Sequence, residues 1–174
     1  MATAQSTSRT LSKNANPVRK PARDAVALLK ADHADVKKCF KDYEKLVKKG
    51  AGARERQALA AEICKMLTVH AQIEEEIFYP ASRELLGDDA DLVDEADVEH
   101  ASAKELIAQI EDGSAEDMHF NARVKVLAEY IDHHVKEEQD ELFPEVKAAG
   151  MDTKAIGQAL AARKAELMGN AARK

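Results

Sequence analysis

The sequence contains two matching copies of a histidine that is followed four residues later by a glutamate. The first copy, HAQIEEEIFYP, carries His70 and Glu74, and the second, HVKEEQDELFP, carries His134 and Glu138. In both copies a proline follows the histidine by ten positions. A histidine and a glutamate four residues apart share one face of a helix and can reach the same centre. The pattern therefore predicts a duplicated metal site.

A single histidine precedes each copy at a similar distance along the chain. His33 lies 37 residues before the first copy, and His100 lies 34 residues before the second. Burying six such polar groups without a partner would be costly, and metal cations supply a common partner. The predicted metal ligands are six side chains: His33, His70, Glu74, His100, His134 and Glu138.

The make-up of this ligand set predicts two metal ions. A glutamate whose two oxygens both coordinate can bridge two ions, which lie about 3.5–4 Å apart in such sites. We expect Glu74 and Glu138 to bridge, and the four histidines to act as terminal ligands. Imidazole-rich ligation with carboxylates suits iron better than magnesium or calcium, although zinc, manganese and cobalt are chemically possible. The expected cofactor is a pair of non-haem iron ions, and the alternative interpretation is a polar network without metal.

The residues between the glycine-containing loops have helical periodicity. We predict long helices at 22–49, 54–79, 89–112 and 116–147, and a shorter C-terminal helix at 153–168. Each long helix has one apolar stripe with residues three and four apart, and the candidate ligands interrupt these stripes. Short loops make successive helices antiparallel. The expected fold is therefore an all-α, up-down-up-down antiparallel four-helix bundle.

Two features predict how the helices begin and end. Ser114, with Asp117 three residues later, predicts a capping box at the start of the fourth helix. Pro80 and Pro144 are expected to kink or end their helices just beyond the candidate ligands, because proline lacks an amide hydrogen and clashes with the preceding turn.

The composition excludes several classes of function. The chain of 174 residues has a net charge of −6, and residues 1–23 contain five basic residues and no acid, so residues 24–174 carry −11. An acidic body argues against nucleic acid as a partner. No apolar run approaches the length that spans a bilayer. Cys39 and Cys64 are too few for a disulfide framework and predict reduced thiols, so we expect a cytoplasmic protein.

The same features divide the chain into three parts. Residues 1–23 are interpreted as a disordered basic leader, because they contain too few apolar residues to fold. A transit peptide is the alternative for this segment. Residues 24–148 form the predicted bundle, and residues 149–174 form a C-terminal helical tail.

The order His, His-x-x-x-Glu, His, His-x-x-x-Glu on four consecutive predicted helices resembles the hemerythrin-like, HHE cation-binding family. The resemblance covers roughly residues 24–148. It implies a four-helix bundle with a non-haem di-iron centre that binds or reacts with O2 or a related small oxidant. Ferritin-like proteins share this architecture, but they use Glu-x-x-His, which has the reverse order and a shorter spacing.

Two positions depart from the oxygen-carrying hemerythrins. Those proteins have a second histidine four residues after the one on the third helix, where this sequence has Lys104. Their fourth-helix carboxylate is an aspartate five residues after its histidine, where this sequence has Glu138 at four. Four histidines in place of five leave the site more symmetric, which disfavours a simple O2 carrier and favours peroxide or nitric oxide chemistry, including a peroxide-consuming, catalase-like activity. A metal or oxygen sensor, or an iron store without turnover, is the alternative, and we expect a monomer or a weak homo-oligomer.

Several residues near the candidate ligands allow more than one interpretation. His133 could pair with Glu137 in an alternative register, but only the predicted ligand pair one residue further continues the apolar stripe. Tyr43 and Tyr130 could donate a hydrogen bond to the site or ligate iron, or they could pack in the ordinary way. The ammonium group of Lys104 is expected to extend outward. Three acids are expected on a solvated face: Glu75, Glu76 and Glu137.

Overall fold

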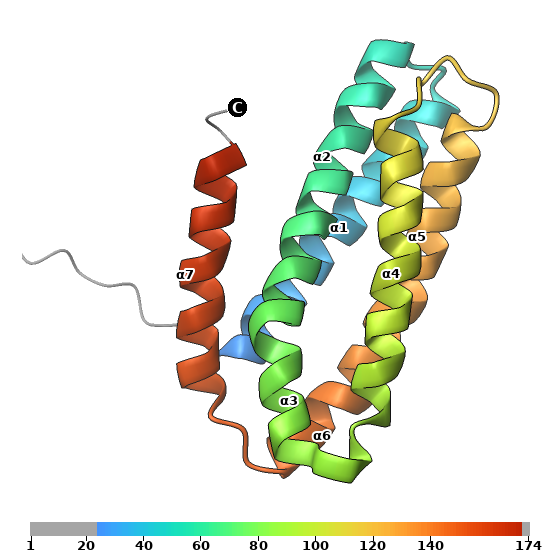
Figure 1. The fold of residues 1–174 in the computed structure, drawn as a ribbon. Coiled ribbons are helices and arrows are strands. Elements are labelled where there is room, and N and C mark those ends of the chain that lie inside the picture. Colours follow the sequence, from blue (N-terminus) through green and yellow to red (C-terminus); the bar gives the residue numbers. More distant parts are fainter. Residues whose placement is uncertain (1–23, 172–174) are drawn as a thin grey trace, which may run out of the picture.

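The computed structural model describes residues 24–171, and all regular structure in that range is helical (Figure 1). Four long helices stand side by side, and each runs antiparallel to the one before it. Each long helix packs against two of the others, so that α1 and α4 lie on opposite corners of the bundle. The predicted up-down-up-down bundle is therefore confirmed. The long helices are α1 (Ala25–Lys48), α2 (Ala53–Ile73), α4 (Asp91–Glu111) and α5 (Phe120–Glu137).

Both α2 and α5 pass into a wider, π-helical turn that begins at a candidate ligand. The first, η1 (Glu74–Phe78), leads into α3 (Tyr79–Leu86), and the second, η3 (Glu138–Leu142), leads into α6 (Phe143–Ala148). In each turn the N–H group at the start of the next helix donates to the carbonyl oxygen of the glutamate five residues earlier. Single π turns of this kind are frequent at functional sites.

The prolines that follow these turns explain them. Pro80 and Pro144 occupy the second positions of α3 and α6, where a proline ring would clash with the carbonyl of a regular α-helical turn. The wider turn removes that clash, so the helix axis continues beyond each proline. The expectation that the second helix ends at residue 79 was therefore wrong, because the helical path extends to Leu86.

The fourth long helix begins later than the sequence predicted. It starts at Phe120 rather than at residue 116. The backbone N–H group of Ser114 donates to Asp117 at 2.9 Å, and the Ser114 hydroxyl accepts from the N–H group of Glu116 at 3.2 Å. These bonds close a turn that precedes the helix, so the expected capping box does not cap α5.

The C-terminal helix, α7 (Thr153–Ala171), is longer than the predicted range and packs along α1, α2 and η1 (Figure 1). Leu160 anchors it in the apolar core. The Thr153 hydroxyl donates to the carboxylate of Asp24, which joins the start of α7 to the start of α1. Gly150, at φ 91°, allows the sharp connection out of α6, because this backbone conformation favours glycine.

The core consists of two apolar clusters, one on each side of the six candidate ligands. One includes Ile63, Leu67 and Leu127, and the other includes Leu29 and Phe143. Both cysteines are free thiols, as expected. None of the helices in the described range is long and apolar enough to cross a membrane. The predicted disorder of the basic leader concerns residues 1–23, which lie outside the described range.

Candidate metal centre

The six predicted ligands meet in the middle of the bundle, and each is at most 8% exposed. Every long helix supplies one histidine, and the two glutamates open the π turns η1 and η3. The register of the apolar stripes directs all six side chains inward. The structure therefore brings the whole candidate set together, and their role as metal ligands stays a prediction.

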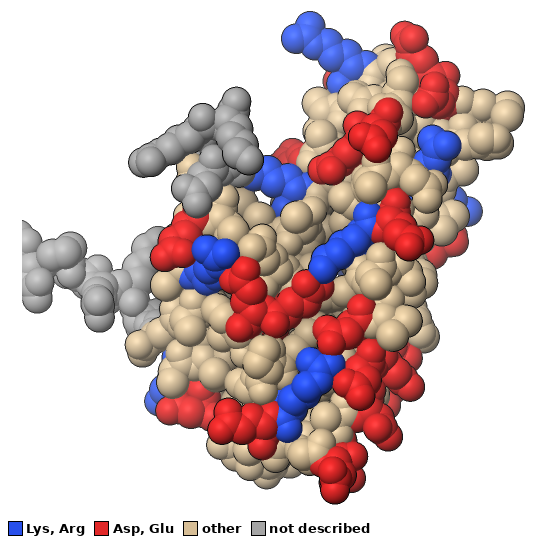
Figure 2. Space-filling view, viewed as in Figure 1, with Lys and Arg blue, Asp and Glu red and all other residues tan. Residues whose placement is uncertain are grey.

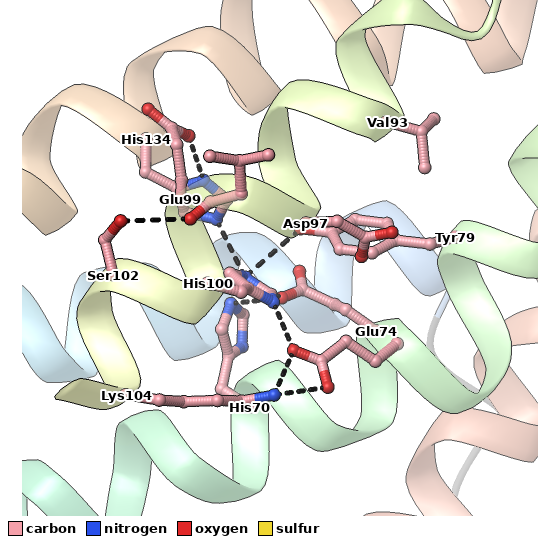
Figure 3. Close-up of polar contacts among 12 residues, drawn as sticks. His70, Glu74, Tyr79, Val93, Asp97, Glu99, His100, Ser102, Lys104 and His134 are labelled. Carbon is pink, nitrogen blue, oxygen red and sulfur yellow. Dashed lines mark hydrogen bonds and ion pairs between the residues drawn. The ribbon is translucent and has the colours of Figure 1, made fainter. Parts of the chain in front are cut away.

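The four histidines form two pairs. The Nε2 atoms of His33 and His70 lie 2.9 Å apart, and those of His100 and His134, which face each other in Figure 3, lie 3.2 Å apart. These pairs divide the bundle into halves, because α1 and α2 supply one pair while α4 and α5 supply the other. Two metal ions would therefore each receive one pair of imidazoles.

Each glutamate lies between the two histidine pairs. Oε2 of Glu74 is 3.2 Å from Nε2 of His70 and 3.6 Å from Nε2 of His100. Oε2 of Glu138 is 3.2 Å from Nε2 of His33 and 3.6 Å from Nε2 of His134. One oxygen of each glutamate therefore faces a histidine of each pair, so each carboxylate could contact ions held by both pairs.

The outer nitrogen atoms of the α4 and α5 histidines are held by carboxylates. Nδ1 of His100 is 2.9 Å from Glu75, and Nδ1 of His134 is 2.7 Å from Glu99, which lies beside it in Figure 3. Such outer contacts fix the orientation and tautomer of a metal-binding imidazole. The expectation that Glu75 lies on a solvated face was therefore wrong.

The outer contacts of the α1 and α2 histidines are weaker. Nδ1 of His70 lies 3.6 Å from Asp32, which is too long for a direct hydrogen bond, and Nδ1 of His33 lies 3.0 Å from the amide of Gln139. Asp32 also accepts from Lys164 of α7. The two halves of the site therefore differ in the groups that face the outer nitrogen atoms. These groups are two carboxylates in the α4 and α5 half, and one more distant carboxylate and one amide in the α1 and α2 half.

The unsatisfied atoms of the centre show that it fits metal cations. If both imidazoles of His100 and His134 are neutral and carry their protons on the Nδ1 atoms that face carboxylates, their Nε2 atoms point lone pairs at each other across 3.2 Å. Only a proton or a metal cation can be shared between two such lone pairs. Both oxygens of Glu74 and one of Glu138 are buried without a hydrogen-bond partner among the described residues. Metal ions would satisfy all of these atoms, so the residues present fit a two-metal site.

Burial and neighbouring charges shift the ionisation of these groups. Burial, followed by the charge of Glu138, raises the pKa of Glu74 well above its usual value. Burial would also raise the pKa of Glu138, but the close contact with His33 and the charges of the other imidazoles outweigh it and lower that pKa to about 2. Burial and His134 lower the pKa of His100 to about 4. Burial therefore opposes a charge on Glu74, while the surrounding imidazoles favour a charge on Glu138.

Tyr79 is a site residue that the sequence reasoning missed. Its side chain is fully buried, and its hydroxyl donates to Oε1 of Glu138 at 3.0 Å and lies 3.2 Å from Nε2 of His100. The signal was the residue before each proline, which is a tyrosine in the first copy (FYP) and a phenylalanine in the second (LFP). The equivalent residue, Phe143, has no hydroxyl. This tyrosine therefore makes the duplicated site asymmetric.

The two tyrosines that the sequence singled out have other roles. The Tyr43 hydroxyl donates to Asn121 at 2.8 Å, and Tyr130 packs against an apolar cluster. Lys104 extends outward and binds the carboxylate of Glu75 at 2.6 Å. His133 is exposed and lies 3.2 Å from Glu137, so this alternative pair is outside the centre.

A cavity of about 20 Å³ adjoins the histidines. All four imidazoles line it, together with apolar side chains that include Leu67, Ala103 and Ile107. A volume of this size holds one or two small molecules of the size of water. An external molecule can therefore approach the centre from the histidine side only if it is small.

Comparison with known proteins places these features in a family. A model of the hemerythrin HHE cation binding domain matches residues 24–146. The crystal structure of a hemerythrin HHE cation binding domain-containing protein from Mycobacterium kansasii superposes with a TM-score of 0.72 at 23% identity, covering 87% of this chain and 91% of that chain. This likeness supports the fold. A curated protein of Nostoc sp. (strain PCC 7120), described as a DNA nickase, is 36% identical over 93 residues, which are 52% of this chain but only 25% of the relative.

Proposed function

The chain belongs to the hemerythrin HHE cation-binding family, and from this premise we propose that it is a non-haem di-iron protein that binds or reacts with O2, peroxide or nitric oxide. One observation carries the proposal. The two histidine pairs face each other. Glu74 and Glu138 each place one carboxylate oxygen within 3.6 Å of one histidine from each pair. Iron suits this set of imidazoles and carboxylates.

The side chains of this chain would hold the two ions and control their surroundings. The four Nε2 atoms and the two carboxylates would supply the ligands, while Glu75 and Glu99 keep His100 and His134 in the tautomer that leaves Nε2 free. Bound iron would supply redox and Lewis-acid chemistry. The apolar clusters on both sides exclude bulk water.

The number of histidine ligands and the residue at position 104 favour turnover of peroxide over reversible O2 binding. The oxygen carriers have an additional histidine where this chain has Lys104, and the Lys104 ammonium group is engaged with Glu75. Each metal would then receive two histidines, so neither is distinguished by a third imidazole. We propose that two molecules of hydrogen peroxide are converted to two molecules of water and one of O2.

An oxygen electrode tests this activity directly. Iron-loaded protein is mixed with hydrogen peroxide, and the O2 that evolves is compared with that from a His70→Ala variant. Evolution well above the variant supports the proposal. If the wild-type protein evolves no more than the variant, yet its reduced form takes up O2 and releases it under argon, the protein is an oxygen carrier.

We propose a small oxidant, rather than nucleic acid or a membrane, as the partner. The name of the nickase relative describes a protein of which the matched segment is only a quarter. Residues 24–174 carry a net charge of −11. On the face drawn in Figure 2, lysine and arginine side chains are interspersed with acidic ones and form no continuous basic surface. Such a surface does not favour binding to phosphates.

A further inference from the structure

A groove of about 520 Å³ lies between α1 and α5. Its walls are mainly apolar and include Val36, Phe40, Val124 and Ile131. Phe40 and Val47 belong to the apolar stripe of α1, yet Phe40 is only half-buried and Val47 is 37% exposed. The two helices therefore leave part of their inner faces uncovered, with a volume within the range of small-molecule sites.

The groove leads to the candidate metal centre. It shares four lining residues with the cavity of about 20 Å³ beside the histidines: His33, Val36, Ile131 and Val135. Three of these are aliphatic side chains that stand between the two spaces, and the fourth is a candidate ligand. A molecule in the groove is thus separated from the centre by a few rotatable side chains.

We propose that this groove collects a weakly hydrated diatomic gas, O2 or nitric oxide, and delivers it to the metal centre through a gate formed by Val36, Ile131 and Val135. The proposal rests on the di-iron function proposed above and concerns its reactions with O2 and nitric oxide, whereas peroxide, the reactant favoured there for turnover, would reach the centre by a different route. The size of the inner cavity restricts the reactant to very few atoms.

The lining of the groove selects for gases over hydrogen-bonding oxidants. An apolar molecule gains free energy when it leaves water for an apolar space, whereas hydrogen peroxide must give up hydrogen bonds to enter. The charged groups near the mouth are largely paired, Lys37 with Asp132 and Lys125 with Glu129. A separate pocket of about 10 Å³, lined by Glu99, Glu137 and Glu138, offers polar groups to a hydrogen-bonding reactant.

Xenon provides a test that needs no reaction. Crystals of the full chain under xenon pressure are expected to show xenon in the groove beside Val36 and Ile131, because xenon is an apolar probe of gas-binding space. Ala128 lines the groove one helical turn before Ile131. An Ala128→Trp variant should lose this xenon. Wild-type crystals without xenon in the groove would overturn the proposal, whatever the metal content of the protein.

Rapid mixing of the reduced, iron-loaded protein with nitric oxide and with O2 tests delivery of both gases. Ala128→Trp is expected to slow both combination rates roughly tenfold, which corresponds to a modest extra barrier, and Val36→Ala is expected to raise them. The control is Val126→Trp, which makes the same change on the exposed face of α5. Rates for Ala128→Trp within twofold of the control would overturn the proposal.

Two further comparisons separate the possible causes of a negative result. The reaction with peroxide should change less than the reactions with gases, and an equal fall would show that the groove does not select apolar reactants. If wild-type protein reacts with none of the three oxidants, the proposed function fails, while xenon binding still decides whether the groove holds gas. Should Ala128→Trp fail to fold, Ala128→Met makes a smaller change at the same place.

Discussion

The hydroxyl group of Tyr79 donates a hydrogen bond of 3.0 Å to Oε1 of Glu138, from the start of α3 to the start of η3. The bond joins the two halves of the duplicated site, and the second copy of the motif has no counterpart to Tyr79 because Phe143 occupies the equivalent position. The remaining oxygen of Glu138 faces His33 and His134. Tyr79 therefore orients one of the two carboxylates that are expected to bridge.

Replacing Tyr79 should weaken metal binding without removing it. Loss of an outer hydrogen bond to a ligand typically costs about 10–100-fold in metal affinity, and we expect Tyr79→Phe to fall in this range. Chelator competition monitored by the iron spectrum measures the change. Tyr43→Phe is the matched control, because the Tyr43 hydroxyl bonds to Asn121. Equal affinities for the two variants would contradict the role given to Tyr79.

Replacing a bridging glutamate should release both ions together. Glu74→Gln removes the charge and one coordinating oxygen, while the side chain keeps its size, so each half of the site loses a ligand. Elemental analysis should show less than one metal ion per chain. Glu76→Gln is the control, because Glu76 lies two residues away, is exposed and binds Arg163. A Glu74→Gln protein that retains its full metal content would exclude bridging by this residue.

The C-terminal helix should influence the metal centre through Lys164. This residue binds Asp32, whose other oxygen faces Nδ1 of His70. Burial would raise the pKa of Asp32, but the contacts with His70 and Lys164 outweigh it and lower that pKa. Lys164→Met should reduce metal affinity by about tenfold, at the lower end of the range for outer contacts, and Lys164→Arg should restore it.

Arg163 offers a neighbouring control for this experiment. It binds Glu76, which is exposed and lies outside the centre. Arg163→Met should therefore leave metal affinity and the electron paramagnetic resonance signal of the one-electron-reduced centre unchanged. If both variants change the signal equally, α7 acts only by packing, and the assignment of Lys164 as a positioning residue fails.

Cys64 should be unreactive in the folded protein. Burial, followed by the charge of Glu111, raises the pKa of its thiol from 9.0 to about 12. A thiol reagent at neutral pH should therefore modify Cys39 slowly, because burial raises its pKa as well, and should reach Cys64 only after denaturation. Two fast-reacting thiols in the native protein would contradict this burial.

The same thiol predicts a loss of stability in alkaline solution. Because the folded state holds the Cys64 proton more tightly, the contribution to the free energy of unfolding is complete below pH 9.0 and is lost as the pH rises toward about 12. Urea unfolding over this range should show wild type losing more stability than Cys64→Ala. Parallel losses in the two proteins would assign the alkaline effect to other groups.

The bundle and its six inward residues could be predicted from the sequence because helical spacing decides which side chains share a face. His70 and Glu74, like His134 and Glu138, are separated by about one turn and interrupt an apolar stripe, so their burial follows from the periodicity. The two single histidines, His33 and His100, fall on the other two helices of the bundle, α1 and α4. No longer-range information was needed for this part.

The outer contacts could not be predicted in the same way. Glu75 lies one residue after a candidate ligand and was placed on a solvated face, yet it contacts His100 of a different helix. That contact depends on the axial offset of α2 and α4, which the sequence does not encode locally. The π turns are a similar case, since Pro80 and Pro144 signal a disturbed helix without specifying whether it ends, bends or widens.

The central claim is a centre of two iron ions, and the most direct test is the metal content of protein from iron-replete cells. Elemental analysis should give about two iron atoms per chain, as in other two-metal sites. Mössbauer spectra of the air-oxidised sample should show a coupled diferric pair. Near-zero iron, a single iron atom per chain or zinc in place of iron would contradict the account.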